Sequence, residues 1–126
     1  MEFKEKRPPR TYETGFDGKV VIKDCGGLTL EPEEQVTFLT DSGCEYDVTR
    51  KNWGFYATPS LNVRLEQFNL RAVLVRNTAN RYFVMLVEKG KEYLFDSYIR
   101  NELLKIVCWM DSLENLQHIE EKLSCA

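Results

Sequence analysis

The sequence has little of the chemistry that metal and nucleophilic sites require. It contains one histidine, His118, and four cysteines, Cys25, Cys44, Cys108 and Cys125, none of them in a C-x-x-C pair. A structural zinc ion usually takes four closely spaced Cys or His ligands, and a nucleophilic cysteine needs a base nearby. We therefore expect no metal site, and we expect reduced thiols in a cytoplasmic protein.

Long apolar runs and phosphate-binding loops are missing as well. No stretch approaches the roughly 20 apolar residues that span a bilayer, and residues 1–18 hold basic side chains without the apolar core of a secretory signal. Gly26-Gly27 matches neither G-x-G-x-x-G nor a P-loop. These absences predict a soluble protein with no nucleotide cofactor and no contact with membranes.

The composition is that of one globular domain. The chain has 126 residues, of which 43% are apolar, and its net charge is −3. An acidic balance argues against a nucleic-acid partner, because binding to phosphates needs a basic surface. Pro8-Pro9 interrupts the N-terminal segment, so we expect a flexible basic tail at residues 1–17 and a single domain at 18–126.

Hydrophobic alternation predicts most of the strands. A short strand is expected at 19–23, a first β-hairpin between 36 and 49, and a second between 71 and 87. Residues 58–69 follow neither period and are expected to form a long loop with a short helical turn.

The C-terminal third changes to helical spacing. After Gly90 the apolar stripe predicts a helix at 91–102. The continuous apolar run at 106–110 predicts a strand covered on both faces, and Asp111 with Glu114 has the spacing of a capping box. We expect an α+β fold, in which an N-terminal antiparallel β meander continues into a mixed sheet (β-β-α-β-α) backed by two helices.

Charge is unevenly distributed along the chain. Residues 24–47 hold seven acidic and no basic residues, whereas residues 48–87 hold six basic residues and one acidic residue. Most of these cations are arginines, whose planar fork suits carboxylate and phosphate groups. We predict that residues 50–64 form the rim of a site for an anionic small molecule, with these ligand-binding residues: Arg50, Trp53, Tyr56, Asn62 and Arg64.

A structural interpretation of the same residues stays open. Acidic and basic strands that lie side by side form cross-strand ion pairs without any ligand. The alternation at 53–57 is also typical of a half-buried strand. The sequence does not decide whether residues 53–62 are a functional motif or part of the core.

No complete set of catalytic residues is present. We therefore predict a small non-catalytic binding or accessory protein that forms homodimers through a sheet edge or an apolar face. The alternative is a small enzyme that acts on an anionic or sugar-like metabolite, and the sequence leaves open which of the two it is.

One segment resembles a known family. Arg81-Tyr82-Phe83-Val84-Met85-Leu86-Val87 is similar to the aromatic strand of RNA-recognition-motif domains, although the glycine after the basic residue is missing. This resemblance implies a single-stranded RNA-binding module as a further alternative.

Overall fold

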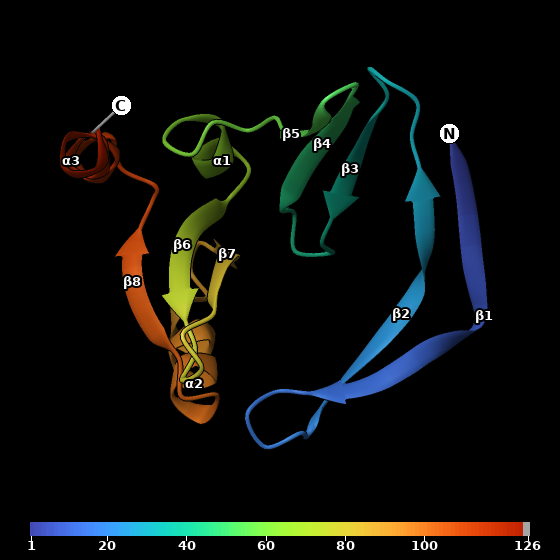
Figure 1. The fold of residues 1–126 in the computed structure, drawn as a ribbon, viewed down its shortest axis with the longest axis horizontal. Coiled ribbons are helices and arrows are strands. Elements are labelled where there is room, and N and C mark those ends of the chain that lie inside the picture. The colour runs from blue at the N-terminus through green and yellow to red at the C-terminus, as the bar shows by residue number, and fades with distance from the viewer. Residues whose placement is uncertain (125–126) are drawn as a thin grey trace. The chain divides into compact units, whose positions relative to one another are not determined.

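The computed structural model describes residues 1–124, and the expected α+β fold is confirmed (Figure 1). Eight strands form three sheets, with the orders β1-β2, β3-β4-β5 and β7-β6-β8. The strands are β1 (Glu2–Thr14), β2 (Val20–Thr29), β3 (Gln35–Leu39), β4 (Glu45–Lys51), β5 (Gly54–Ala57), β6 (Leu70–Arg76), β7 (Tyr82–Glu88) and β8 (Lys105–Trp109). The helices are α1 (Arg64–Gln67), α2 (Glu92–Asn101) and α3 (Leu113–Leu123). None of the helices in this part of the chain has the length and apolar character needed to cross a membrane.

The described chain divides into two compact units. The first unit comprises Met1–Thr37 and Asp47–Thr58, and the second comprises Phe38–Tyr46 and Pro59–Ala126. The predicted domain boundaries at 17 and 18 stay a prediction.

In the first unit, the segment expected to be a tail forms the long strand β1, which pairs with β2 in an antiparallel ribbon. The pairing register shifts between Glu5 and Arg10, so Pro8 and Pro9 fall at the irregularity, where a missing N–H breaks no regular ladder bond. The predicted strand at 19–23 is extended to Thr29 because the partner strand continues past it. Pairing with distant residues thus overrides the local signal of the prolines.

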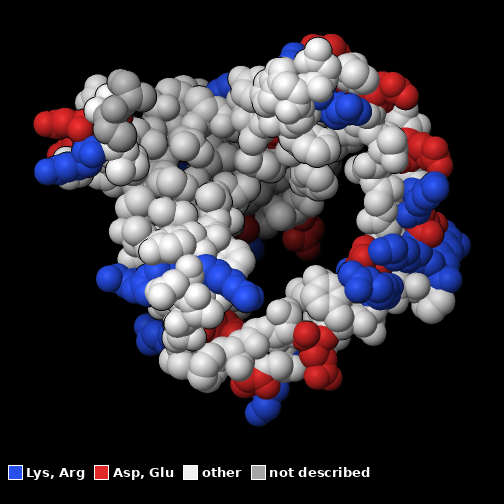
Figure 2. All heavy atoms as spheres, viewed as in Figure 1, with Lys and Arg blue, Asp and Glu red and all other residues white. Residues whose placement is uncertain are grey.

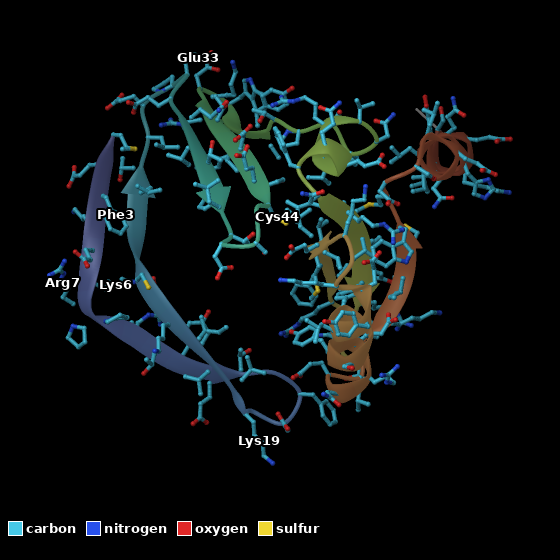
Figure 3. All side chains as sticks on the ribbon, turned by 180° about the vertical axis from the view of Figure 1, so that it is seen from behind. Phe3, Lys6, Arg7, Lys19, Glu33 and Cys44 are labelled. Carbon is cyan, nitrogen blue, oxygen red and sulfur yellow. The ribbon has the colours of Figure 1, made fainter. Side chains whose placement is uncertain are left out.

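The basic residues of β1 are paired within the ribbon. Asp24 accepts hydrogen bonds from the side chains of Lys6 and Arg10, and Arg7 lies 2.7 Å from a Glu5 oxygen. On the face drawn in Figure 2, blue and red side chains alternate along this ribbon. Figure 3 shows Phe3 and Lys6 on the same ribbon, with Phe3 lying between the two strands.

The second unit is built on the β7-β6-β8 sheet. The predicted hairpin at 71–87 is confirmed as β6 and β7, and β6 is antiparallel to both of its neighbours. On one face, which we call face B, the buried Val73 and Val75 pack with Phe95 and Ile99 of α2. On the other face, which we call face A, Leu70 and Ala72 pack with other buried residues, Cys44 and Leu65.

The crossover from β7 through α2 passes over one strand of the sheet. β8 joins the far side of β6 and does not pair with β7, although the two strands run in the same direction. The prediction that 106–110 is covered on both faces is wrong: Val107 is 43% exposed, and Cys108 and Met110 are half-buried. The strand lies at an edge of the sheet, pairs with β6 alone, and has none of its side chains buried.

α3 begins one residue later than the predicted capping box. The Ser112 side chain accepts a hydrogen bond from the backbone N–H of Asn115 and is the N-cap. Asp111 instead binds an arginine that lies forty residues earlier in the chain. Because that partner is distant, local spacing could not predict the assignment.

Candidate functional site

Three of the predicted rim residues, Arg50, Trp53 and Tyr56, lie in the first unit, on or between β4 and β5. Trp53 is 69% exposed in the turn, and Tyr56 is also exposed. The register pairs Arg50 with Phe55 and Thr49 with Tyr56, so Arg50 and Tyr56 point to opposite faces of the strand pair. These two side chains therefore do not converge on one surface.

The Arg50 guanidinium has partners of its own. It donates 2.7 Å to the carbonyl oxygen of Leu30 and 2.9 Å to that of Lys51. Lys51 forms an ion pair with Glu33 at 2.7 Å. In this part of the first unit, one cation of the basic segment is thus paired with a carboxylate of the acidic segment, which lies in the turn between β2 and β3.

The other two predicted rim residues belong to the second unit. Arg64 opens α1, and its guanidinium carbon lies 5.3 Å from the ring centre of Phe68. Asn62 precedes α1 and lines a hollow of about 560 Å³. A volume of this size is typical of small-molecule sites. The role of all five rim residues stays a prediction, but only Asn62 contributes to this hollow.

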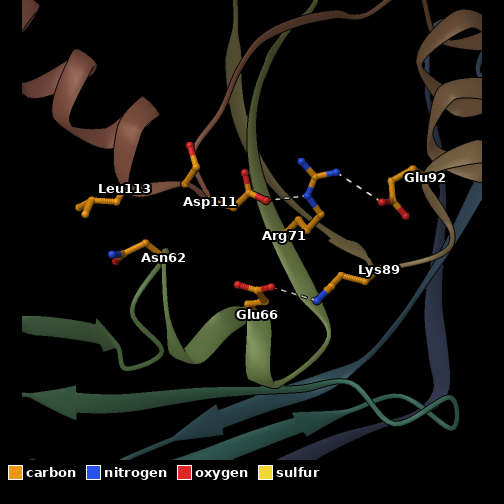
Figure 4. Close-up of a pocket in the computed structure, with 8 residues that line it drawn as sticks. Asn62, Glu66, Arg71, Lys89, Glu92, Asp111 and Leu113 are labelled. Carbon is orange, nitrogen blue, oxygen red and sulfur yellow. Dashed lines mark hydrogen bonds and ion pairs between the residues drawn. The ribbon is translucent and has the colours of Figure 1, made fainter.

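The topology of the sheet brings the walls of the hollow together. The start of β6 and the C-terminal ends of β7 and β8 meet at one end of the sheet because β6 is antiparallel to both. α1 adds residues from the segment before β6, and the fully buried Leu65 anchors it. The lining residues, most of them labelled in Figure 4, are Asn62, Glu66, Arg71, Lys89, Glu92, Asp111, Ser112 and Leu113.

Arg71 is held in place on several sides. Its Nε donates 2.6 Å to Asp111, and one Nη lies 3.3 Å from Glu92 (Figure 4). Its guanidinium carbon lies 4.0 Å from the ring centre of Trp109. The hydrogen bond to Asp111 raises the pKa of Arg71, although burial acts in the opposite direction. Arg71 and Asp111 therefore form a fixed, charged wall.

Glu66 and Lys89 form a looser pair across the hollow. Their charged atoms are 3.3 Å apart, and their side chains are 61% and 40% exposed. An exposed ion pair of this kind contributes little to stability. A ligand can therefore separate the two groups at small cost and use both as hydrogen-bonding partners.

Glu92 also lines the hollow, where its ionised carboxylate can accept hydrogen bonds. Hydrogen bonds from its own backbone N–H and from that of Gly90 lower the pKa of its carboxyl group, with a further contribution from Arg71. A general acid requires the opposite shift, towards neutral pH. The pKa direction suits a binding role for Glu92.

No protein-family model matches the chain, and neither a curated protein nor a solved structure is similar to it. The function must be argued from the hollow itself. Its formal charge is −1, from two cations and three carboxylates.

A second hollow, of about 250 Å³, is small and apolar. It lies beside Cys44, which is 2% exposed and labelled in Figure 3, and its walls include Phe38, Leu39 and Leu86. The volume is below the range of most small-molecule sites. The thiol donates 3.6 Å to the carbonyl oxygen of Asn69, which fits a packing role.

The described residues were also compared with what metal binding, thiol chemistry and RNA binding require. Within residues 1–124, no group of three His, Cys, Asp or Glu side chains is placed to hold a metal ion. Cys25, Cys44 and Cys108 are free thiols, and Cys125 lies outside the described residues. Tyr82 and Phe83 are consecutive in β7 and point to opposite faces, so they do not form one stacking surface for RNA bases.

Most of this hollow could not be located from the sequence. Arg71, Lys89, Glu92 and Asp111 all lie outside the rim predicted at residues 50–64. Their convergence depends on the strand order β7-β6-β8, which local patterns do not encode. A partial signal is present in the sequence: Arg71 begins a predicted strand, Lys89 and Asp111 follow predicted strands closely, and Glu92 stands at the start of the predicted helix.

Proposed function

We propose that the protein is a non-catalytic binding protein for a small, sugar-like ligand, held in the hollow between Asn62, Glu66, Arg71 and Glu92. The observation that carries this proposal is the mixture of donors and acceptors around a cavity of about 560 Å³. Hydroxyl groups both donate and accept hydrogen bonds, so a polyhydroxylated molecule can satisfy both kinds of partner.

A sugar or amino sugar fits this charge pattern better than a simple anion does. Arg71 already has two carboxylate partners, and a bound phosphate would compete with them. An added ammonium group would instead find three carboxylates within the same walls. The anionic ligand expected from the sequence is thus the less supported of the two classes.

A binding role is favoured over an enzymatic one by the protonation state of the site. The lowered pKa of Glu92 keeps this carboxylate ionised, whereas proton transfer needs a group that titrates near the working pH. We also propose that the protein works in the cytoplasm, where its free thiols would remain reduced, and that it self-associates.

The proposal is tested by ligand-induced thermal shifts followed by calorimetry. The probes are neutral monosaccharides, their 2-amino and uronic-acid derivatives, and a sugar phosphate. A ligand that binds only the folded protein must raise the melting temperature, and we expect the neutral or amino sugars to do so.

Matched variants locate the site. We expect Asn62→Ala and Glu66→Gln to weaken binding, while Asp96→Asn, an exposed carboxylate change on α2, leaves it unchanged. Binding that both pocket variants retain in full, or the absence of a shift with every probe, would refute the proposal.

A further inference from the structure

Among the described residues of the second unit, cover on face A of the β7-β6-β8 sheet comes only at one end. Cys44 and Leu65 pack on that face at Leu70 and Ala72. Farther along β6, Leu74 pairs with Val84 on one side and with Cys108 on the other. Val84 is 62% exposed, and Leu74 and Cys108 are half-buried. A row of three apolar side chains across the sheet is therefore at least partly exposed to solvent.

The open part of face A ends in basic residues. Arg76 is level with Tyr82 of β7 and Lys105 of β8, so all three side chains share this face. Arg76 donates to Asn80, and Lys105 is exposed. The surface thus combines an apolar centre with positive charge at one end.

α3 has the complementary character. Leu113, Leu116, Ile119 and Leu123 form an apolar stripe at helical spacing, yet no residue of α3 is buried. Leu113 and Leu123 are 57% and 70% exposed. Figure 1 shows the helix standing clear of the sheet that precedes it. Glu120 lies one turn after Leu116, so a negative charge borders the stripe.

The chain's own α3 is directed away from face A. Arg71 and Trp109 lie on face B, and Arg71 holds Asp111 at 2.6 Å, directly before the helix. Asn115 also donates 3.1 Å to the carbonyl oxygen of Trp109. These bonds fix the short link from β8 to α3, and moving the helix to face A would break them.

We propose that α3 of one copy docks on the open part of face A of a second copy, and that the exchange is reciprocal. Each copy supplies one helix and one face, which gives a closed dimer with two-fold symmetry. Leu116 and Ile119 would cover Leu74, Val84 and Cys108, and Glu120 would approach Lys105. Charge complementarity between the acidic border of the stripe and the basic end of face A favours this chain as its own partner. The inference rests on the self-association proposed above and is independent of the ligand.

The first test measures the mass of the full chain in solution by sedimentation equilibrium. We expect a dimer, and we expect Leu116→Glu and Val84→Glu each to raise the dissociation constant by about tenfold or more, because each removes an apolar contact at the centre of the interface. His118→Glu, on the opposite side of α3, is the matched control and should leave the dimer unchanged. All of these positions are at least partly exposed, and circular dichroism with thermal melting checks that each variant folds.

Mixing experiments then test whether α3 of one copy binds face A of the other, as opposed to a dimer formed through other surfaces. The Leu116→Glu and Val84→Glu chains should form a heterodimer when combined, since one intact face and one intact helix remain. Glu120→Lys should weaken the dimer, and Lys105→Glu should restore it in the double variant. A monomer at every concentration, or a dimer that both apolar variants preserve, would overturn the inference. Sugar binding measured on the same samples shows separately whether the ligand proposal holds.

Discussion

Arg71, near the start of β6, donates a hydrogen bond of 2.6 Å from Nε to Oδ2 of Asp111, in the link between β8 and α3. This bond joins the central strand of the sheet to the link that follows its edge strand β8, forty residues later in the sequence. The carbon of the same guanidinium lies over the Trp109 ring, 4.0 Å from its centre. Both contacts are partly buried, so they should contribute to stability as well as to the shape of the hollow.

Replacing Arg71 tests that contribution. We expect Arg71→Ala to lower the free energy of unfolding by about 1–3 kcal/mol, because it leaves Asp111 without its charged donor and removes the contact with Trp109. Arg76→Ala, which removes an arginine bound to an exposed asparagine, should cost less. Urea denaturation measures both. A double-mutant cycle with Asp111→Ala isolates the pair, and additive effects would contradict a direct coupling.

Acid should destabilise the protein through four carboxyl groups. Hydrogen bonds lower the pKa of each group below its ordinary value, which is 3.8 for Asp and 4.5 for Glu. The donor with the largest effect is the Lys6 side chain for Asp24, the Glu31 backbone N–H for Glu34, the Lys91 side chain for Glu88 and its own backbone N–H for Glu92. A pKa lowered by folding gives stability that is present above the unfolded value and is lost as the pH falls through the folded value.

We therefore expect the free energy of unfolding to be constant from about pH 7 to pH 5 and to fall below about pH 4.5. Urea titrations across this range measure it. Glu88→Gln should reduce the pH dependence, because it removes one of the four groups. A free energy that is the same at about pH 3 as at pH 6 would contradict the assignment.

Gly26 and Gly27 provide a matched pair in β2. Gly26 has a φ of +147°. A Cβ added there would collide with the carbonyl oxygen of Lys4 and would lie 2.9 Å from the Phe3 ring. A Cβ added at Gly27 would meet nothing within 4 Å. We expect Gly26→Ala to destabilise the β1–β2 ribbon by about 1–3 kcal/mol and Gly27→Ala to have a smaller effect. Thermal melting compares them, and equal losses would argue against a close approach at Gly26.

Leu65 links the core to the proposed ligand site. Its side chain is fully buried, and α1, which contains it, also presents Glu66 to the hollow. Leu65→Ala should lower the free energy of unfolding by about 2–5 kcal/mol through the cavity that it creates. Leu61→Ala, at a residue that is 36% exposed, is the control. If the two changes cost the same, Leu65 is not the anchor of this helix.

Local sequence patterns predicted the strands and helices of this protein better than they predicted which elements pair or pack with each other. Alternation in 71–87 was sufficient for the β6–β7 hairpin because each strand meets its neighbour across a short turn. Helical spacing likewise placed α2, and Phe95 and Ile99 of its stripe do pack on the sheet. In both cases the interactions that decide the structure lie close together in the sequence.

Long-range pairing accounts for what the sequence did not reveal. β1 depends on β2 and forms despite Pro8-Pro9, and β8 joins β6 at an edge although its apolar run suggested a buried strand. The proposed rim failed to anticipate the hollow for the same reason. Arg71, Glu92 and Asp111 meet there only because three strands end together.

The central position of β6 has a consequence for how the second unit assembles. Both sides of β6 carry ladder hydrogen bonds, one set to the strand made directly after it and the other to a strand made only after α2. During synthesis, the β6–β7 hairpin can close early, but its other edge must wait until Trp109 has left the ribosome. In the finished protein, more amides of β6 than of β7 or β8 should be protected from exchange with deuterium, since those of β6 find a ladder partner on either side, whereas alternate amides of β7 and β8 point away from β6.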